Sequence, residues 1–313
     1  MSTATDAARA GPTVRRGDRI FAGLARSAGI LILIALAGVA VFLVVEAWPA
    51  LHADSADLPG DQNFLSYVAP FVYGTIIAAV IALAIAMPLA VGIALFISHY
   101  APRRLARSLG YVIDLLAAVP SVVFGLWGIQ WLAPHVQPAY AWLVNNLGFI
   151  PLFSGKVSST GRTILTVGIV LAVMILPIIT AVTREVFLQV PSLHEEAALA
   201  LGSTRWEMIR MAVLPFGRSG IVSAAMLGLG RALGETMAVA LVLSPSTVIS
   251  VALLTAQNPS TIAANIALSF PESTGIKVNA LIASGLVLFA ITLVVNMLAR
   301  YVIGRRSEFS GAN

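Results

Sequence analysis

Hydrophobic residues run through this 313-residue chain in long, nearly unbroken blocks. A helix that crosses the hydrocarbon core of a bilayer needs about 20 consecutive, mostly apolar residues. Six blocks are long enough, at residues 27–48, 70–98, 108–133, 163–185, 217–243 and 278–301. The pattern therefore predicts six transmembrane helices. The second block contains Pro88, which we expect to kink the helix rather than end it.

The composition agrees with a chain that lies mostly inside a membrane. Hydrophobic residues make up 58% of the sequence, charged residues make up 11%, and the mean hydropathy is +0.92. Soluble domains carry about 25% charged residues, so we expect an all-α, multi-pass membrane protein. The first apolar block is longer than the apolar core of a secretory signal, which spans about 7–15 residues. An uncleaved first span is therefore predicted.

Two features exclude classes of chemistry. The sequence has no cysteine, which removes disulfides and cysteine-ligated metals. Its only Gly-Lys pair, Gly155–Lys156, lacks the flanking glycine and the Ser or Thr that a nucleotide-binding P-loop needs. We therefore expect no metal site, and no hydrolysis of nucleotide by a P-loop in this chain.

Basic residues are distributed unevenly between the segments that join the apolar blocks. The two tails and the loops after the second and fourth blocks together hold fifteen arginines, whereas the opposite loops hold three basic residues. Because basic residues concentrate on the cytoplasmic side of membrane proteins, both termini are predicted to lie in the cytoplasm. The net charge of +5 follows from this bias and gives no reason to expect a nucleic-acid partner.

Two segments on the predicted outer side are long enough to carry structure of their own. Residues 49–66 contain three aspartates and no basic residue, and residues 245–277 contain two short apolar runs, 248–254 and 262–270. Each run is too short to cross the bilayer, so we expect interfacial or re-entrant segments packed on the outer face. This pattern fits either a docking surface for an external partner or a lid over the bundle.

The sequence of the loop between the fourth and fifth blocks, residues 186–215, predicts two short capped helices. The patterns S-x-x-E at 192–195 and T-x-x-E at 204–207 each match a capping box. Gly202 lies between them, where a left-handed residue would end the first helix. The second helix presents Trp206 among charged residues. Such a hairpin fits either a docking site for a soluble protein or a pair of helices lying flat in the lipid headgroups.

The same loop carries a specific spacing of residues. The matching positions are Glu196, Ala197, Ala198, Gly202, Leu214 and Pro215, with Ala212 where isoleucine is usual. This spacing resembles the EAA signature of inner-membrane permease subunits of binding-protein-dependent ABC transporters. The resemblance implies that the loop enters a cleft on a separate ATPase subunit, with Gly202 permitting the turn and Glu196 bracing the loop. Trp206 and Pro215 complete the predicted coupling residues.

The fifth block contains a charged pair, Arg231 and Glu235. An ionisable group in hydrocarbon costs roughly 2.5–3.5 kcal/mol on insertion scales, so such groups usually face a polar interior. On a continuous helix the two side chains would lie on one face and could form a structural salt bridge. Alternatively they form a transient anion site, in which the guanidinium holds two oxygens and the carboxylate accepts a protonated oxygen. The second interpretation favours a protonated oxyanion over sulfate.

The third block contains residues that interrupt a helix and residues that allow close packing of helices. Pro120 interrupts the regular helix bonding, and Ser121 offers a hydroxyl beside the freed backbone. Gly125 and Gly128 allow a close approach of another helix. These residues fit either a constriction of a pathway or helix packing alone. Asp114, further toward the cytoplasmic end, is expected to snorkel or to pair with a loop arginine.

Two motifs make the resemblance more specific. Residues 231–239, RALGETMAV, and residues 117–128, AAVPSVVFGLWG, resemble the span-five and span-three motifs of phosphate ABC-transporter permeases of the PstC type. The sister PstA-type subunit usually has GETAPL where this chain has GETMAV. The resemblance implies the ABC transporter type I permease fold. Its boundaries would be a cytoplasmic basic tail at 1–26, a first transmembrane helix at 27–48, a permease domain at 65–304 with its coupling loop at 186–215, and a cytoplasmic tail at 305–313.

The resemblance implies a non-catalytic permease subunit of an ATP-driven phosphate importer in the cell inner membrane. Inorganic phosphate would follow a path lined by Arg231, Glu235 and Ser121 and shared with a PstA-type sister permease. Two copies of an ATPase subunit would use the ATP, and an extracytoplasmic phosphate-binding protein would deliver the substrate. Apart from membrane lipid, no further partner is implied, and we expect no cofactor.

The residues alone leave alternative functions open. A permease for another oxyanion, such as sulfate or molybdate, has the same requirements. A stand-alone secondary transporter gives no obvious role to the capped cytoplasmic loop. An intramembrane enzyme would need a Ser–His or multi-carboxylate site at membrane depth. The four histidines, at 52, 99, 135 and 194, all fall in loops or at span ends, which argues against such an enzyme.

Overall fold

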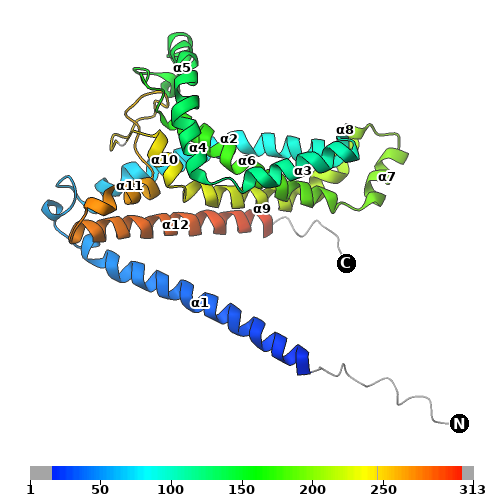
Figure 1. Ribbon diagram of the computed structural model, residues 1–313, viewed down its shortest axis with the longest axis horizontal. Coiled ribbons are helices and arrows are strands. Elements are labelled where there is room, and N and C mark those ends of the chain that lie inside the picture. The colour runs from blue at the N-terminus through cyan, green and yellow to red at the C-terminus, as the bar shows by residue number, and fades with distance from the viewer. Residues whose placement is uncertain (1–15, 245, 305–313) are drawn as a thin grey trace.

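The structure is a computed structural model that describes residues 16–244 and 246–304. In these residues all regular elements are helical, and they form an elongated bundle (Figure 1). Most of the predicted N-terminal tail and the whole predicted tail at 305–313 lie outside the described residues. The described part of the N-terminal tail, from Arg16 onward, already belongs to the first helix.

Five long helices form the frame of the molecule. They are α1 (Arg16–Leu51), α2 (Phe64–Leu95), α6 (Ile164–Leu188), α9 (Leu214–Leu233) and α12 (Ile276–Gly304). The shorter helices of the described part are α3 (Arg103–Ala117), α4 (Ser121–Trp127), α5 (Ala133–Leu147), α7 (Ser192–Ala200), α8 (Arg205–Met208), α10 (Met237–Val242) and α11 (Ile262–Ser269).

Within the described residues, five helical stretches are long and apolar enough to cross a membrane, and a sixth results if one bent pair is a single span. The count agrees with the six predicted spans. The bent pair, Arg103–Ala117 and Ser121–Leu147, turns by 91°. The predicted interruption of the third block, 108–133, at Pro120 is therefore confirmed. Pro120 lacks an N–H group and disfavours a helical conformation at the residue before it, so one helix ends there and another begins.

Three widened, π-helical turns each end two residues before a proline. These are η2 (Phe96–Tyr100), η3 (Gly128–Leu132) and η5 (Ile209–Val213), before Pro102, Pro134 and Pro215. Pro134 and Pro215 lie inside continuing helices, where the proline ring would clash with the carbonyl four residues earlier and a π turn moves that carbonyl away. Because of η5, the helical path runs unbroken from Arg205 to Leu233. The predicted separation of the second loop helix from the fifth span is therefore wrong.

The centre of the bundle is built by α2, α6 and α9. One face of α2 carries alanines at every fourth position, namely Ala78, Ala82, Ala86 and Ala90, and each is at most 1% exposed. Such small side chains let a neighbouring helix approach closely. On α6, Leu171, Met174 and Ile175 pack into the same core. Pro88 lies inside α2 without ending it, as predicted.

α1 leaves the bundle along most of its length (Figure 1). Only its C-terminal end, at Ala47 and Ala50, is buried, and it packs there with α2 and α12. The rest of the helix exposes apolar side chains. These side chains have the character that contact with lipid or with another chain requires.

The segment after α10 packs on the end of the bundle that carries α5 and α11 (Figure 1). The apolar run 262–270 begins as α11, and the run 248–254 has no regular structure although Leu254 is fully buried. Asn258 holds this segment to α6, since its Oδ1 accepts from the Ile164 N–H at 3.2 Å. Neither run crosses the bundle, in agreement with the prediction.

Candidate functional site

The fifth apolar block contains a break that separates its two charged residues. α9 ends at Leu233, α10 begins at Met237, and the three residues between them leave the helical path. The predicted continuous helix at 217–243, with Glu235 one turn beyond Arg231 on the same face, is therefore wrong. Within the described residues, no ion pair joins the two side chains.

Glu235 and Arg162 hold the two ends of α10. Glu235 is 8% exposed, and its Oε1 accepts a hydrogen bond from the Ala238 N–H at 3.1 Å. At the other end, Arg162 Nε donates to the Val242 carbonyl at 3.1 Å and its Nη2 donates to the Leu241 carbonyl at 3.2 Å. A helix carries partial positive charge at its N-terminus and partial negative charge at its C-terminus. Both side chains therefore complement the dipole of this short helix.

Two glycines of the third block bring α4 against α10. A Cβ at Gly125 would lie 2.9 Å from the Ala238 Cα, and a Cβ at Gly128 would lie 2.9 Å from Val242 Cγ2. The predicted role of these glycines in close helix approach is confirmed. Since later residues of α4 meet later residues of α10, the two helices run in the same direction, and their N-terminal ends are neighbours.

Ser121 lies at this junction. It is the first residue of α4, directly after Pro120, and it is half-buried. The structure thus places Ser121 and Glu235 at the adjoining ends of two half-helices. It places Arg231 elsewhere, on the last turn of α9.

Arg231 faces a groove of about 660 Å³. The other lining residues are Ile178 of α6, Ser223, Met226, Leu227 and Gly230 of α9, and Asn296 of α12. The Nε atom of Arg231 is buried and has no hydrogen-bond partner in the part of the chain that the structure describes. A guanidinium offers five donors in a fixed fork that matches the oxygens of an oxyanion. The groove therefore offers an uncompensated cation, beside the polar side chains of Ser223 and Asn296, to an anion.

The hairpin of α7 and α8 is the second candidate site. α7 ends at Ala200, and Gly202, which follows its C-cap Leu201, has φ +84°. The Gly202 N–H donates to the Leu199 carbonyl at 2.9 Å. The capping box of Thr204 and Glu207 is complete, because each residue accepts a hydrogen bond from the backbone N–H of the other. The predicted left-handed glycine and the second capping box are both confirmed.

The first predicted capping box is wrong. Ser192 is the first residue of α7, after Pro191, and makes no capping bond. The Oε1 atom of Glu195, the predicted partner of Ser192, lies instead 3.3 Å from His99 Nε2. The other ring nitrogen, His99 Nδ1, lies 2.6 Å from the hydroxyl oxygen of Ser98. Sequence reasoning missed His99 as a contact of the hairpin, because 96 positions separate it from Glu195 and no local pattern links them.

The hairpin of α7 and α8 protrudes from one end of the bundle (Figure 1), and the remaining coupling residues differ in exposure. Glu196 and Ala197 are exposed, Ala198 is half-buried, Trp206 is 56% exposed, and Pro215 lies in the first turn of α9. Leu193, Leu201 and Met211 add exposed apolar surface. On the inner side, Ile209 and Val213 are fully buried in a cluster with Phe187 of α6. The hairpin is therefore anchored to the membrane helices and apolar where it protrudes.

Asp114 makes no ion pair within the described residues, so of the two expected alternatives, snorkelling or pairing with a loop arginine, the pairing is not found. It is exposed and lines a smaller cavity that is separate from the Arg231 groove.

The order of these elements and motifs matches that of known transport proteins. The family described as "Binding-protein-dependent transport system inner membrane component" matches residues 86–308. The chain belongs to this family. It is therefore a multi-pass permease component of an inner membrane rather than an enzyme, and the family is not expected to bind a cofactor. Membership implies that this permease works with a binding protein and an ATPase.

Curated relatives of this permease resemble it over nearly its whole length. Phosphate transport system permease protein PstC 2 of Mycobacterium tuberculosis is 48% identical over 310 residues, which cover 93% of each chain. PstC of Mycobacterium leprae is 46% identical and covers 98% of this chain and 99% of its own. PstC of Mesorhizobium japonicum is 40% identical, with 96% and 95% covered.

Solved structures share the fold of this permease. A bacterial ABC transporter involved in the import of the acidic polysaccharide alginate has a chain with a TM-score of 0.56 and 17% identity, covering 92% of this chain and 99% of that one. The MetNI methionine ABC transporter, in an inward-facing conformation, gives a TM-score of 0.52 at 14% identity, with 76% and 93% covered. At these identities the likeness shows the fold alone.

The turn at Gly202 gives a direct test of the hairpin. A Cβ at this position would meet nothing within 4 Å, so any effect of substitution comes from the positive φ. We expect Gly202→Val to weaken the hairpin, because a strained backbone of this kind costs about 1–3 kcal/mol. Gly202→Asn is the matched control, since asparagine tolerates the left-handed conformation. The measurement is copurification of the ATPase with each variant, and equal copurification would contradict this account of the turn.

The capping role of Glu235 predicts a difference between two substitutions. Glu235→Gln keeps a side-chain oxygen that accepts from the Ala238 N–H, whereas Glu235→Ala leaves that donor unpaired at a cost of about 1–3 kcal/mol. We expect the alanine variant of the purified complex to unfold at a lower temperature than the glutamine variant. If both variants melt together, well below the wild type, the negative charge of Glu235 matters more than its cap.

Proposed function

We propose that this chain is the permease subunit of an ATP-driven phosphate importer. Two observations support the proposal. The relatives that match it over more than 90% of their length are named phosphate transport system permease proteins. The groove beside α9 presents a guanidinium whose buried Nε is unpaired among the described residues, and a guanidinium is a donor suited to a tetrahedral oxyanion.

The proposal depends on Arg231, which would bind the anion, while Ser121 and Glu235 would shape another part of the same path. The arginine lies near the end of the α9 face that includes Ser223 and Leu227, both of which are exposed. An exposed face on which small residues such as Ser223 and Gly230 lie beside Leu227 suits contact with a second permease chain. A PstA-type sister permease would close the groove into a shared passage. Phosphate would then meet the arginine in a space shielded from lipid.

The choice of phosphate rests on the relatives rather than on Glu235. Its carboxylate is bonded to the backbone of α10 and does not share a groove with Arg231. In this proposal Glu235 fixes the adjoining ends of α4 and α10, where Ser121 lies. An anion imported from the end of the bundle that carries α5 and α11 would reach this junction before Arg231. A sulfate or molybdate permease would need the same arginine, so uptake must be measured with more than one anion.

In this proposal both termini and the α7–α8 hairpin lie in the cytoplasm, which the bias of basic residues supports. The exposed apolar tip of the hairpin would then enter a cleft on one copy of the ATPase subunit, and a second copy would serve the sister permease. The opposite end of the bundle, with α5 and α11, would face the phosphate-binding protein. ATP would be used by the ATPase alone.

Uptake by Arg231→Gln tests the proposal. A hydrogen bond to a charged group contributes about 1.5–3 kcal/mol, so we expect phosphate uptake to fall roughly 10- to 150-fold in the assembled transporter. Arg218→Gln is the matched control, because Arg218 is exposed at the start of the same helix. Uptake of radiolabelled phosphate and sulfate is measured in cells, with assembly checked by copurification. Undiminished phosphate uptake by an assembled Arg231→Gln transporter would overturn the proposal.

A further inference from the structure

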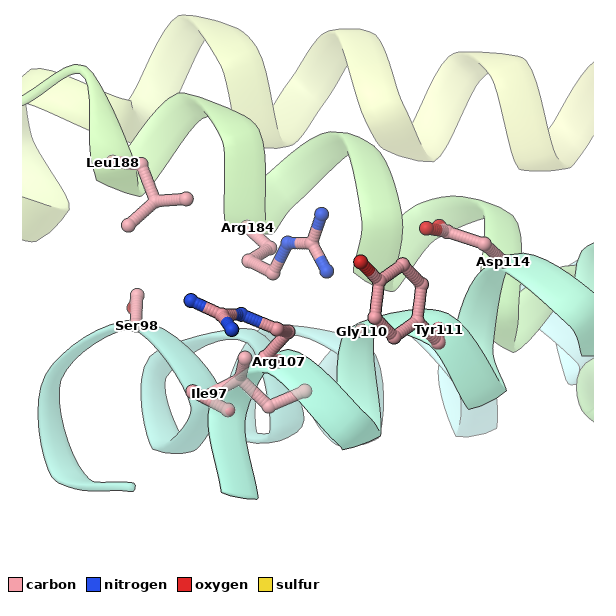
Figure 2. A pocket seen from close by; sticks show the side chains of 9 residues that line it. Ile97, Ser98, Arg107, Gly110, Tyr111, Asp114, Arg184 and Leu188 are labelled. Atoms are coloured by element: carbon pink, nitrogen blue, oxygen red, sulfur yellow. The ribbon is translucent and has the colours of Figure 1, made fainter. Parts of the chain in front are cut away.

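A second cationic cavity lies near the hairpin end of the bundle, away from Arg231. Its volume is about 290 Å³, and it lies between η2, α3 and the C-terminal part of α6 (Figure 2). The lining residues are Ile97, Ser98, Ala106, Arg107, Gly110, Tyr111, Asp114, Arg184 and Leu188. Two of them are arginines from different helices. The function proposed for the groove beside α9 gives this cavity no role.

Arg184 is held at the cavity with part of its hydrogen-bonding capacity unused. Its side chain is 18% exposed, and its buried Nε has no hydrogen-bond partner in residues 16–244 and 246–304. One terminal nitrogen contacts Glu185 Oε1 at 2.6 Å, and that carboxylate is 58% exposed and does not line the cavity. A Cβ at Gly110 would overlap Arg184 Nη1. Glycine at this position therefore lets the guanidinium lie directly on α3.

Arg107 supplies a second guanidinium from α3. It is exposed and forms no hydrogen bond or ion pair with any described residue. Figure 2 shows the Arg107 and Arg184 side chains reaching into the same space between α3 and α6, with Tyr111 beside them and Asp114 beyond Tyr111. Neither arginine is paired with Asp114. The cavity thus holds more positive than negative charge along its lining.

We propose that this cavity binds a phosphate group through Arg107 and Arg184. Guanidinium groups from two helices can each donate to the oxygens of one phosphate, and such charge-assisted hydrogen bonds are roughly twice as strong as neutral ones. The phosphate group comes either from free inorganic phosphate or from the headgroup of an anionic phospholipid. Asp114 distinguishes the two sources. Its carboxylate can accept from a protonated phosphate oxygen, which inorganic phosphate has and the phosphodiester of a headgroup lacks.

The cavity is connected to the coupling hairpin through a short series of contacts. Ser98 of the lining lies 2.6 Å from His99 Nδ1, and His99 Nε2 lies 3.3 Å from Glu195 of α7. A phosphate group in the cavity would also bridge α3 to α6, the helix that anchors the hairpin through Phe187. Occupancy of the cavity would therefore stabilise one position of the hairpin relative to the bundle.

Binding to the purified transporter complex tests this proposal. The variants are Arg107→Gln and Arg184→Gln, and the control is Arg104→Gln, which removes an exposed charge from the same helix outside the lining. All are made in the Arg231→Gln background, so that phosphate at the groove beside α9 does not contribute. The probes are radiolabelled inorganic phosphate and phosphatidylglycerol retained from nanodiscs of mixed phosphatidylglycerol and phosphatidylcholine. We expect about tenfold weaker binding of one probe, equivalent to about 1.4 kcal/mol.

The two supporting outcomes identify the source of the phosphate group. Loss of phosphatidylglycerol retention in both arginine variants, with Asp114→Asn unaffected, assigns the cavity to a lipid headgroup. Loss of inorganic phosphate binding in both variants and in Asp114→Asn assigns it to free phosphate. Equal binding of both probes by the variants and by Arg104→Gln would overturn the proposal. This failure is independent of the transport proposal, which is tested by uptake in Arg231→Gln alone.

Discussion

A short helix held between two opposite charges fixes the geometry of the membrane domain. α10 has six residues, and water cannot satisfy its end groups inside an apolar bundle, where each unsatisfied group costs several kcal/mol. Glu235 bonds to an N–H group at one end, and Arg162 bonds to carbonyls at the other. The carboxylate of Glu235 is therefore hydrogen-bonded to the backbone of α10 rather than paired with Arg231. Arg231, four positions earlier, has no ionic partner among the described residues and faces a groove. The proposed function depends on that separation.

The same helix that carries Arg231 begins in the coupling hairpin. The helical path from Arg205 to Leu233 is 29 residues long, which corresponds to about 43 Å. The π turn η5 allows Pro215 to lie in this path without ending it. Close contacts also tie its early part to α6, because a Cβ at Gly220 would overlap Val186. A movement imposed on the hairpin would therefore reach the Arg231 groove through a continuous element.

The parts of the structure that the sequence predicted are those set by local patterns. The number of apolar blocks, the left-handed Gly202 and the capping box at 204–207 each depend on neighbouring residues. The break between α9 and α10 was not predicted, since the sequence there has no proline. The break depends instead on the buried carboxylate of Glu235 and on the contact with α4, which together favour the start of a new helix. The contact of His99 with Glu195 and the pairing of two arginines around one cavity depend on tertiary packing, which periodicity does not encode.

The claim that the Arg231 groove belongs to a water-filled path driven by the hairpin has a direct test. The chain has no cysteine, so Ser223→Cys places a unique thiol in this permease at the wall of the groove. The rate of its modification by a membrane-impermeant thiol reagent is measured in the assembled transporter, with and without a non-hydrolysable ATP analogue. Val39→Cys on the apolar part of α1 is the control. The account predicts that the thiol in the groove reacts, and that its rate changes several-fold with nucleotide. A thiol as unreactive as the control in both states would contradict it.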